Sequence, residues 1–196
     1  MKRKYELKKR AESQAETRRR IVEATIQLHQ TKGPARTTFS DVAQLAGVQR
    51  ATLYSHFPTE RDLGLACSGL HSERNPAPDP ADWLSLMGEE RLRRGLTEMY
   101  SFFERNQAMF SRVLADSVSH ELSRELFELR FGEQLGKIRS ALAGALPSRG
   151  RKALAALALA LNFGTWQQLS RGGLSSAAAA DVMVRALFAQ RATVRR

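Results

Sequence analysis

The residues best suited to chemistry lie in one short stretch, AGVQRATLYSHF, at positions 46–57. On a helix, Leu53 and Phe57 are four residues apart and share a face that can hold the segment to a core. An arginine can donate two hydrogen bonds to guanine, and threonine and alanine methyl groups can contact the methyl group of thymine. The other face carries mostly side chains that can form hydrogen bonds: Gln49, Arg50, Ala51, Thr52, Tyr54, Ser55 and His56.

This polar face has two interpretations. A polar helix face is most often simply solvated, and the helical layout around it also occurs in proteins that do not contact DNA. The alternative is that Arg50, Ala51 and Thr52 contact base edges, while Tyr54 and His56 bind phosphates and fix the register. We favour the second interpretation, because the face is rich in hydrogen-bond donors.

The elements that would position this stretch are short helices. Apolar residues at helical spacing predict a first helix over 17–32, which Gly33 and Pro34 end. Thr38 and Asp41 have the spacing of a capping box that opens a second helix, and Gly47 suits its left-handed end. Three helices with a glycine turn between the second and third predict a helix-turn-helix, whose last helix enters the major groove.

The rest of the chain is also predicted to be helical. Three prolines in residues 75–82 exclude a regular helix there and suggest a boundary. The predicted fold is therefore all-α, with an N-terminal three-helix DNA-binding domain and a C-terminal helical bundle. Further helices are expected at about 88–105, 107–119, 121–146, 151–171 and 175–192. The expected domains are a basic arm (1–16), the helix-turn-helix domain (17–63) and the bundle (64–196).

The segment TTFSDVAQLAGVQRATLYSHFPTERDL, residues 37–63, resembles the DNA-binding signature of the TetR/AcrR family of bacterial transcriptional regulators. The shared features are a threonine pair, an Ala-Gly-Val turn and a Leu-Tyr-x-His-Phe helix end. The resemblance implies base contacts from Arg50, Ala51 and Thr52. It also implies contacts to the DNA backbone from Thr38, Tyr54 and His56.

Two positions depart from the family pattern. Gln49 stands where the family usually has a serine that caps the recognition helix; glutamine caps poorly but is long enough to contact a base. Glu60 stands where a lysine commonly binds phosphate, and its carboxylate would repel that group. The neighbouring Arg61 is the residue we expect to take over this contact.

Charge points to a polyanionic partner. The formal net charge is +11, and residues 1–20 hold nine Lys or Arg against three Glu. The basic segment is either a solvated tail or an arm that lies along or in the minor groove of DNA. Charge alone would also suit a membrane surface, but the longest apolar run is about half of the ~20 residues that a membrane span needs. With a single cysteine and no signal-like segment, we expect a cytoplasmic, nucleoid-associated bacterial protein without a membrane partner.

The C-terminal part is rich in aromatic residues and methionines. Most belong in the core of a bundle, but the family resemblance implies a pocket for a small apolar or amphipathic effector of unknown identity. The residues expected to line it are Trp83, Met99, Phe102, Phe103, Phe110, Phe127, Phe163 and Trp166.

The last two predicted helices are apolar on more than one side. Such helices contact two things, one of which is their own domain. The other is expected to be a second copy of the chain, as is usual in the family, giving a homodimer suited to a palindromic operator. The expected interface residues are Leu157, Leu161, Val184, Leu187 and Phe188.

No catalytic arrangement is found, so an enzyme is not expected. Cys67, His71 and Glu73 are the one group of metal-ligating types, but two or three ligands without a fourth are a weak signal, and no metal or cofactor is expected. The sequence predicts a ligand-responsive homodimeric repressor that binds double-stranded DNA and is released by its effector. The alternatives are a DNA-binding protein without an effector, and a helical small-molecule-binding or interaction module.

Overall fold

The computed structural model describes residues 2–189, in which all regular secondary structure is helical and no strand occurs. This confirms the all-α prediction. Within that range no helix is long and apolar enough to cross a membrane. The chain divides into two compact units: residues 1–74 with 108–130, and residues 75–107 with 131–196. The first break falls at the start of the proline-rich segment; the expected functional boundaries at 16 and 63 remain predictions.

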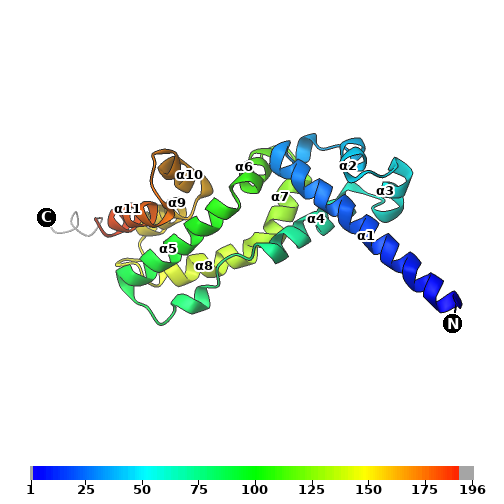
Figure 1. The fold of residues 1–196 in the computed structure, drawn as a ribbon. Helices are drawn as coiled ribbons and strands as arrows, with labels where there is room; N and C mark the ends of the chain where they lie inside the picture. Colours follow the sequence, from blue (N-terminus) through cyan, green and yellow to red (C-terminus); the bar gives the residue numbers. More distant parts are fainter. Residues whose placement is uncertain (1, 190–196) are drawn as a thin grey trace. The chain divides into compact units, whose positions relative to one another are not determined.

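The first unit begins with α1 (Lys2–Thr31), the longest helix of the described chain. The sequence predicted this helix only from residue 17, because its first half has no apolar stripe. Lys, Arg, Glu, Gln and Ala nevertheless have high helix propensity, and they continue the helix toward the N-terminus. Figure 1 shows this half of α1 extending beyond the helices α2 and α3 of the same unit.

Three further short helices follow, of which the first and third pack on α1 and the second packs on the first. They are α2 (Phe39–Ala46), α3 (Arg50–His56) and α4 (Glu60–Arg74), and a 3-10 turn (Pro34–Arg36) precedes α2. Their shared core contains Ile21, Val42, Leu53, Phe57 and Leu63. The unit is completed by α6 (Gln107–Asp116) and α7 (Glu121–Phe127), and α7 packs on α4.

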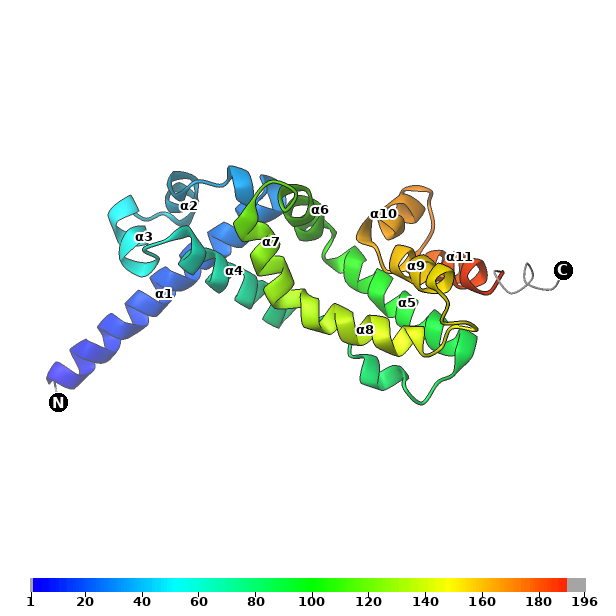
Figure 2. The same ribbon diagram turned by 180° about the vertical axis from the view of Figure 1, so that it is seen from behind.

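The second unit is built around α5 (Gly88–Arg105), which buries seven residues including Leu92, Leu96 and Phe103. The helix α11 (Ser176–Ala189) runs beside it (Figure 2). The Tyr100 hydroxyl donates to the Ala160 carbonyl at 2.7 Å, and burial raises the pKa of this phenol above its usual range. The other elements are a 3-10 turn (Pro80–Trp83), α8 (Glu133–Ala143), α9 (Arg151–Ala160) and α10 (Phe163–Arg171).

Three further predicted helices differ from the observed ones. The 107–119 helix ends at Asp116, and the 121–146 helix is interrupted by a π-helix, Glu128–Gly132, between α7 and α8. The 151–171 helix is broken after Ala160, because the Asn162 side chain accepts from the Gly164 N–H at 2.8 Å and starts α10 anew. Of the 175–192 helix, residues 176–189 are confirmed, and residues 190–192 lie outside the described range.

Candidate nucleic-acid interface

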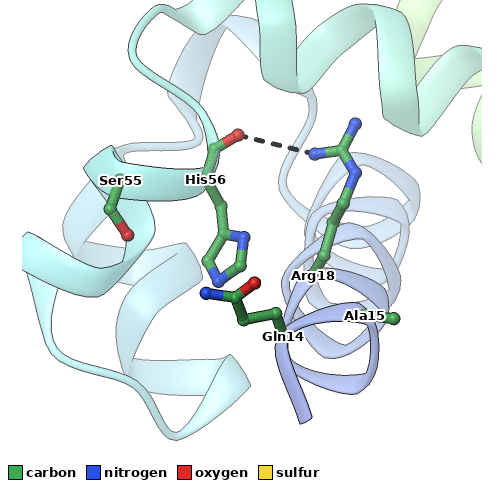
Figure 3. Close-up of a pocket in the computed structure, with 5 residues that line it drawn as sticks. All are labelled: Gln14, Ala15, Arg18, Ser55 and His56. Atoms are coloured by element: carbon green, nitrogen blue, oxygen red, sulfur yellow. Dashed lines mark hydrogen bonds between the residues drawn. The ribbon is translucent and has the colours of Figure 1, made fainter. Parts of the chain in front are cut away.

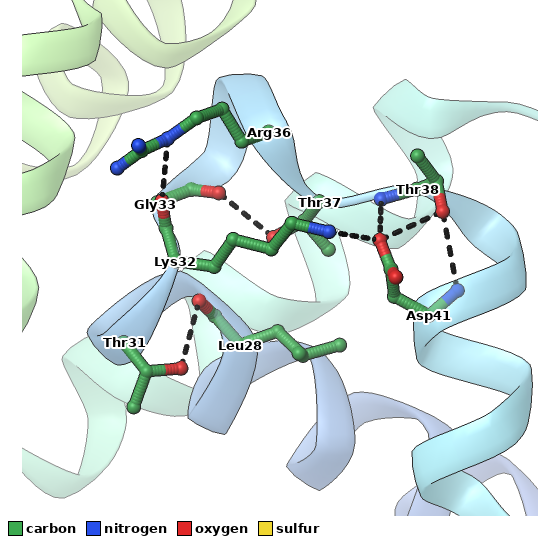
Figure 4. A network of polar contacts seen from close by, with 8 residues as sticks. All are labelled: Leu28, Thr31, Lys32, Gly33, Arg36, Thr37, Thr38 and Asp41. Carbon is green, nitrogen blue, oxygen red and sulfur yellow. Dashed lines mark hydrogen bonds and ion pairs between the residues drawn. The ribbon is translucent and has the colours of Figure 1, made fainter.

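The start of α2 is fixed by a charged network (Figure 4). The Thr38 hydroxyl accepts from the Asp41 N–H at 3.2 Å, and the Asp41 carboxylate accepts from the Thr38 N–H at 2.8 Å, which confirms the predicted capping box. Lys32 pairs with the same carboxylate at 2.6 Å. The Lys32 ammonium and the Thr38 donors together lower the pKa of Asp41 well below its usual range. Thr38, predicted to contact DNA, is thus exposed but also engaged in capping.

The turn between α2 and α3 has the predicted geometry. Gly47 has φ 64° and ψ 41°, the left-handed conformation that glycine adopts without steric cost. The half-buried Val48 then packs against the core of the unit. This turn sets the direction in which α3 leaves α2.

The helix α3 has one buried and one exposed side, as predicted. Leu53 is fully buried and Phe57, directly after the helix, is 1% exposed. Gln49 is the N-cap residue and makes no capping hydrogen bond with its side chain, so the departure at this position leaves the helix start unsupported. The structure brings the predicted DNA-contacting residues of this segment together: Gln49, Arg50, Ala51, Tyr54 and Ser55 are exposed, and Thr52 and His56 are half-buried.

Aromatic contacts orient two of these side chains. The Tyr54 ring lies 4.9 Å from the Phe39 ring on α2, centroid to centroid. The Arg50 guanidinium carbon lies 5.9 Å from the centroid of Tyr54, within the range of a cation–π contact. Arg50 and Tyr54 therefore lie side by side in one exposed patch on α3, next to its N-cap residue Gln49.

The Arg61 side chain is already engaged in an ion pair. Its guanidinium pairs with the Glu125 carboxylate of α7, and this contact raises the pKa of Arg61 and lowers that of Glu125. Glu60, the departure beside it, lies 3.4 Å from the imidazole Nε2 of His120. Arg130 adds a third tie to α4 by donating to the Leu65 carbonyl at 2.9 Å. The proposed phosphate contact of Arg61 would require breaking an ion pair, and it stays a prediction.

Sequence reasoning missed a hollow beside α3. It has a volume of about 390 Å³ and is lined by Gln14, Ala15, Arg18, Ser55 and His56; we call it the α1–α3 hollow (Figure 3). Gln14 and Arg18 are four residues apart, a spacing that would have placed them on one face had the helix been expected to start earlier. The Arg18 guanidinium lies 4.1 Å over the Phe57 ring and donates to the His56 carbonyl at 3.5 Å.

The helical form of residues 2–16 bears on the predicted minor-groove arm. A helix with its side chains is roughly 10–12 Å across, whereas the minor groove of B-DNA is about 6 Å wide. Insertion into the groove is therefore excluded for this conformation. Whether this helical segment contacts DNA in another way stays a prediction.

The residues predicted to line an effector pocket are divided between the units. Phe110 and Phe127 belong to the first unit, where their ring centroids are 5.7 Å apart. The other six belong to the second, where Phe163 and Trp166 lie 5.3 Å apart. Most are core side chains: Trp83, Met99, Phe102, Phe103 and Trp166 are at most 3% exposed. Their role in ligand binding stays a prediction.

The predicted dimer interface needs correction. Leu157, Val184 and Leu187 are at most 2% exposed within a single chain and cannot offer a surface to a second copy. Leu161 and Phe188 are half-buried. The error arose because α9 and α11 are apolar on several sides, and the sequence did not indicate which side faces inward. The exposed large apolar side chains on these helices are Leu154, Leu159 and Val182.

Cys67, His71 and Glu73 form only a weak metal-site pattern in the sequence. Within residues 2–189 no group of three or more His, Cys, Asp or Glu is placed to hold a metal ion. Cys67 is buried, which raises the pKa of its thiol to about 12, and its sulfur lies 3.6 Å from the Nδ1 atom of His29. A buried thiol that stays protonated is a poor nucleophile and a poor metal ligand.

Comparison with known proteins agrees with this site. Residues 21–67 match the family model of bacterial regulatory proteins, tetR family. Over 52 residues the chain is 44% identical to the HTH-type transcriptional regulator TtgR of Pseudomonas putida, a match that covers 26% of this chain and 25% of TtgR. This chain thus matches about a quarter of the length of that curated relative.

Solved structures extend the likeness to the whole fold. A TetR-like transcriptional regulator from Rhodococcus sp. RHA1 superposes with a TM-score of 0.63 at 15% identity, over 90% of this chain and 96% of that chain. The transcriptional regulator FadR from Bacillus subtilis, in complex with stearoyl-CoA, gives a TM-score of 0.58 at 15% identity, over 86% and 96%. At these identities the likeness concerns the fold alone.

Proposed function

We propose that this chain is a transcriptional regulator that binds double-stranded operator DNA through α3, because residues 21–67 match the family model of bacterial regulatory proteins, tetR family. The observation that carries the proposal is the two-sided α3. Leu53 and Phe57 anchor it in the core, while Arg50, Tyr54 and Ser55 remain exposed beside one another. In this arrangement Arg50, Ala51 and Thr52 contact base edges, and Tyr54 and His56 bind flanking phosphates.

The regulator is proposed to act as a homodimer. Leu154, Leu159 and Val182 leave apolar surface exposed on α9 and α11, and paired recognition helices about 34–36 Å apart would match a palindrome. Leu159→Arg is expected to convert the dimer to a monomer in sedimentation-velocity experiments. Leu84→Arg is the matched control, because Leu84 is 57% and Leu159 59% exposed. If both variants sediment as wild type does, another surface forms the dimer.

The regulator is further proposed to be a repressor that an apolar or amphipathic effector releases from DNA. The aromatic residues of the second unit supply the apolar surroundings for such a ligand, and FadR of similar fold was solved with stearoyl-CoA. Three contacts tie α4 to α7 and the residues that flank it: Arg61 with Glu125, Glu60 with His120, and Arg130 with Leu65. An effector that favours one arrangement of these contacts over another would change operator affinity.

A second candidate function is DNA binding without a small-molecule effector. It is favoured by the dense packing of the predicted pocket residues, such as Trp83 and Trp166, which are at most 1% exposed. Thermal unfolding with a panel of fatty acids, acyl-CoAs and aromatic compounds separates the two functions. A ligand that raises the melting temperature and lowers operator affinity supports the effector, whereas ligands that bind without changing operator affinity contradict it.

The first test is binding of the protein to short duplexes from its own upstream region, by fluorescence anisotropy at ~0.15 M salt with random-sequence competitor. We expect binding at least about 10³-fold tighter than to the competitor. Weak binding that is indifferent to sequence would contradict the proposed function, since net charge alone would then explain it.

A further inference from the structure

The α1–α3 hollow has the properties of an anion site. Of its five lining residues, Arg18, Gln14, Ser55 and His56 carry hydrogen-bonding side chains and none carries a carboxylate. At about 390 Å³ it has room for a phosphate group and several water molecules of about 30 Å³ each. Figure 3 shows Gln14 and Arg18 projecting from α1 toward the end of α3, with the Gln14 amide close to the His56 ring.

We propose that this hollow binds a phosphate of the DNA backbone next to the half-site that α3 contacts. This inference rests on the proposed function and adds to it a second, sequence-independent contact from α1. Ser55 and His56 end the same short helix whose first residues are proposed to contact the bases, so the hollow lies beside the proposed base-contacting residues.

Arg18 is the principal ligand of the phosphate, because its guanidinium is already held in place. It stacks 4.1 Å over Phe57 and directs one N–H toward the His56 carbonyl. A guanidinium has five N–H donors, and a planar, oriented fork suits phosphate oxygens. Little side-chain entropy is then lost on binding, since the rotamer is fixed beforehand.

The other lining residues complete the site. The Gln14 side-chain amide offers two N–H donors from the turn of α1 before Arg18. The Ser55 hydroxyl donates to the Thr52 carbonyl at 2.7 Å, and it can rotate to donate to a phosphate oxygen instead. Together with the His56 imidazole these groups surround the anion from two helices.

The placement of charges on α1 also supports phosphate binding at the hollow. Arg10, Gln14 and Arg18 follow at four-residue spacing and so share the face that lines the hollow. The acidic residues Glu12 and Glu16 lie on the other side, where they face Lys8 at 3.9 Å and Arg19 at 2.8 Å. The helix therefore places Arg10 and Arg18 on the side of α3, while Lys8 and Arg19 pair with glutamates elsewhere on its surface.

The decisive experiment compares Arg18→Gln with Arg19→Gln, since the two variants lose the same charge at neighbouring exposed positions. Arg19 pairs with Glu16 away from the hollow. We expect Arg18→Gln to weaken duplex binding about 10-fold at ~0.15 M salt and to lower the salt slope by about 1. Arg19→Gln is expected to stay within about 2-fold of wild type. Equal losses in the two variants would overturn the proposal.

Two further variants guard against a folding artefact, because Arg18 also covers Phe57. Gln14→Glu places a carboxylate in the hollow at an exposed position, and we expect it to weaken binding without a change in melting temperature. Gln168→Glu, exposed on α10, is its matched control. Equal affinities of these two variants would count against the site even if Arg18→Gln unfolds.

A methylphosphonate scan of the duplex identifies the anion that occupies the hollow. One uncharged linkage should weaken duplex binding by wild type but not by Arg18→Gln, because the variant already lacks the contact to that phosphate. In a parallel titration with inorganic pyrophosphate, submillimolar binding lost in Arg18→Gln, without any coupled linkage in the scan, would assign the hollow to a free phosphate ligand and overturn the DNA assignment.

Failure of this inference is distinguishable from failure of the proposed function. Phosphate contacts do not depend on sequence, so the Arg18→Gln and Arg19→Gln comparison is repeated on a random duplex. If wild type binds selectively and the two variants lose equal affinity, only the proposed phosphate site is contradicted. If wild type binds without selectivity and Arg18→Gln loses more affinity than Arg19→Gln, operator recognition is contradicted and the phosphate site is supported.

Discussion

The two units use their apolar residues differently. In the first, the seven-residue α3 buries Leu53 alone within its length and leaves most of its side chains exposed. In the second, the eighteen-residue α5 buries seven residues, and aromatic rings from α10 pack on it. A helix held by one anchor and its flanking turn has a free face for a partner, whereas a helix enclosed by rings contributes mainly to stability.

The comparison is tested most strongly by removing a ring from the second unit. Trp166 is 1% exposed and lies 6.0 Å from Phe103, centroid to centroid. Trp166→Ala is expected to lower the free energy of unfolding by about 3–5 kcal/mol in urea titrations, and Trp166→Phe by less. A loss below about 1 kcal/mol for the alanine variant would show that the ring is not part of a packed core.

The first unit has a pH-dependent weakness at His29. Burial lowers the pKa of His29 from 6.5 to about 4, although Asp116 opposes this shift. Below pH 6.5 the unfolded chain therefore takes up a proton that the folded chain refuses until about pH 4, and stability falls as the pH falls through this window.

The expected loss between pH 6.5 and 4 is on the order of 2–3 kcal/mol. His29→Gln should lose less stability than wild type over the same window, as measured by urea unfolding at several pH values. The difference between the two proteins is the informative quantity, because it removes the contribution of carboxylates. Parallel curves would contradict the assignment.

On the exposed face of α3, a substitution should change DNA binding and leave stability almost unchanged. Arg50→Ala is expected to reduce discrimination between operator and random duplex about 10- to 100-fold, since a bidentate base contact is worth about 1–3 kcal/mol. The free energy of unfolding should change by less than about 0.5 kcal/mol at this exposed position. Arg149→Ala controls for the lost charge, and an equal effect on discrimination would mean that Arg50 contributes only electrostatics.

The smallest expected effect concerns the start of α3. Thr38 caps α2 with its hydroxyl, whereas Gln49 makes no such bond for α3. Gln49→Ser should raise the free energy of unfolding by about 0.5–1 kcal/mol, because serine can accept from an unpaired N–H of the first turn. Thermal unfolding measures this gain; a decrease would mean that Gln49 stabilises the helix by another contact. A parallel loss of operator affinity would assign Gln49 a base contact.

Local sequence patterns were sufficient to predict how the helices in the core of the first unit start, turn and pack. The capping box of Thr38, the left-handed Gly47 and the inward Leu53 and Phe57 each depend on residues within a few positions of one another. The partners of Arg61 and Arg18 could not be predicted in this way. Glu125 is 64 residues from Arg61, and the hollow depends on α1 beginning at Lys2, fifteen residues before its predicted start at residue 17.

The faces of the second unit were harder to predict. Leu157 and Leu159 are both apolar and two residues apart on α9, yet the first is fully buried and the second 59% exposed. Hydrophobicity alone does not distinguish them, because the buried side depends on α5 and α11, which pack from distant parts of the chain. The predicted dimer contacts failed at Leu157, Val184 and Leu187 for this reason.

The π-helix at Glu128–Gly132 affects how sequences of this region are compared. A π turn holds one more residue than an α turn, so the side chains of α8 point about 100° away from where an unbroken α-helix would place them. Ser123 before it and Ile138 and Leu142 after it are all buried. An alignment that scores residues 121–143 as one α-helix would therefore need a one-residue gap near position 130 to match inward positions with inward positions.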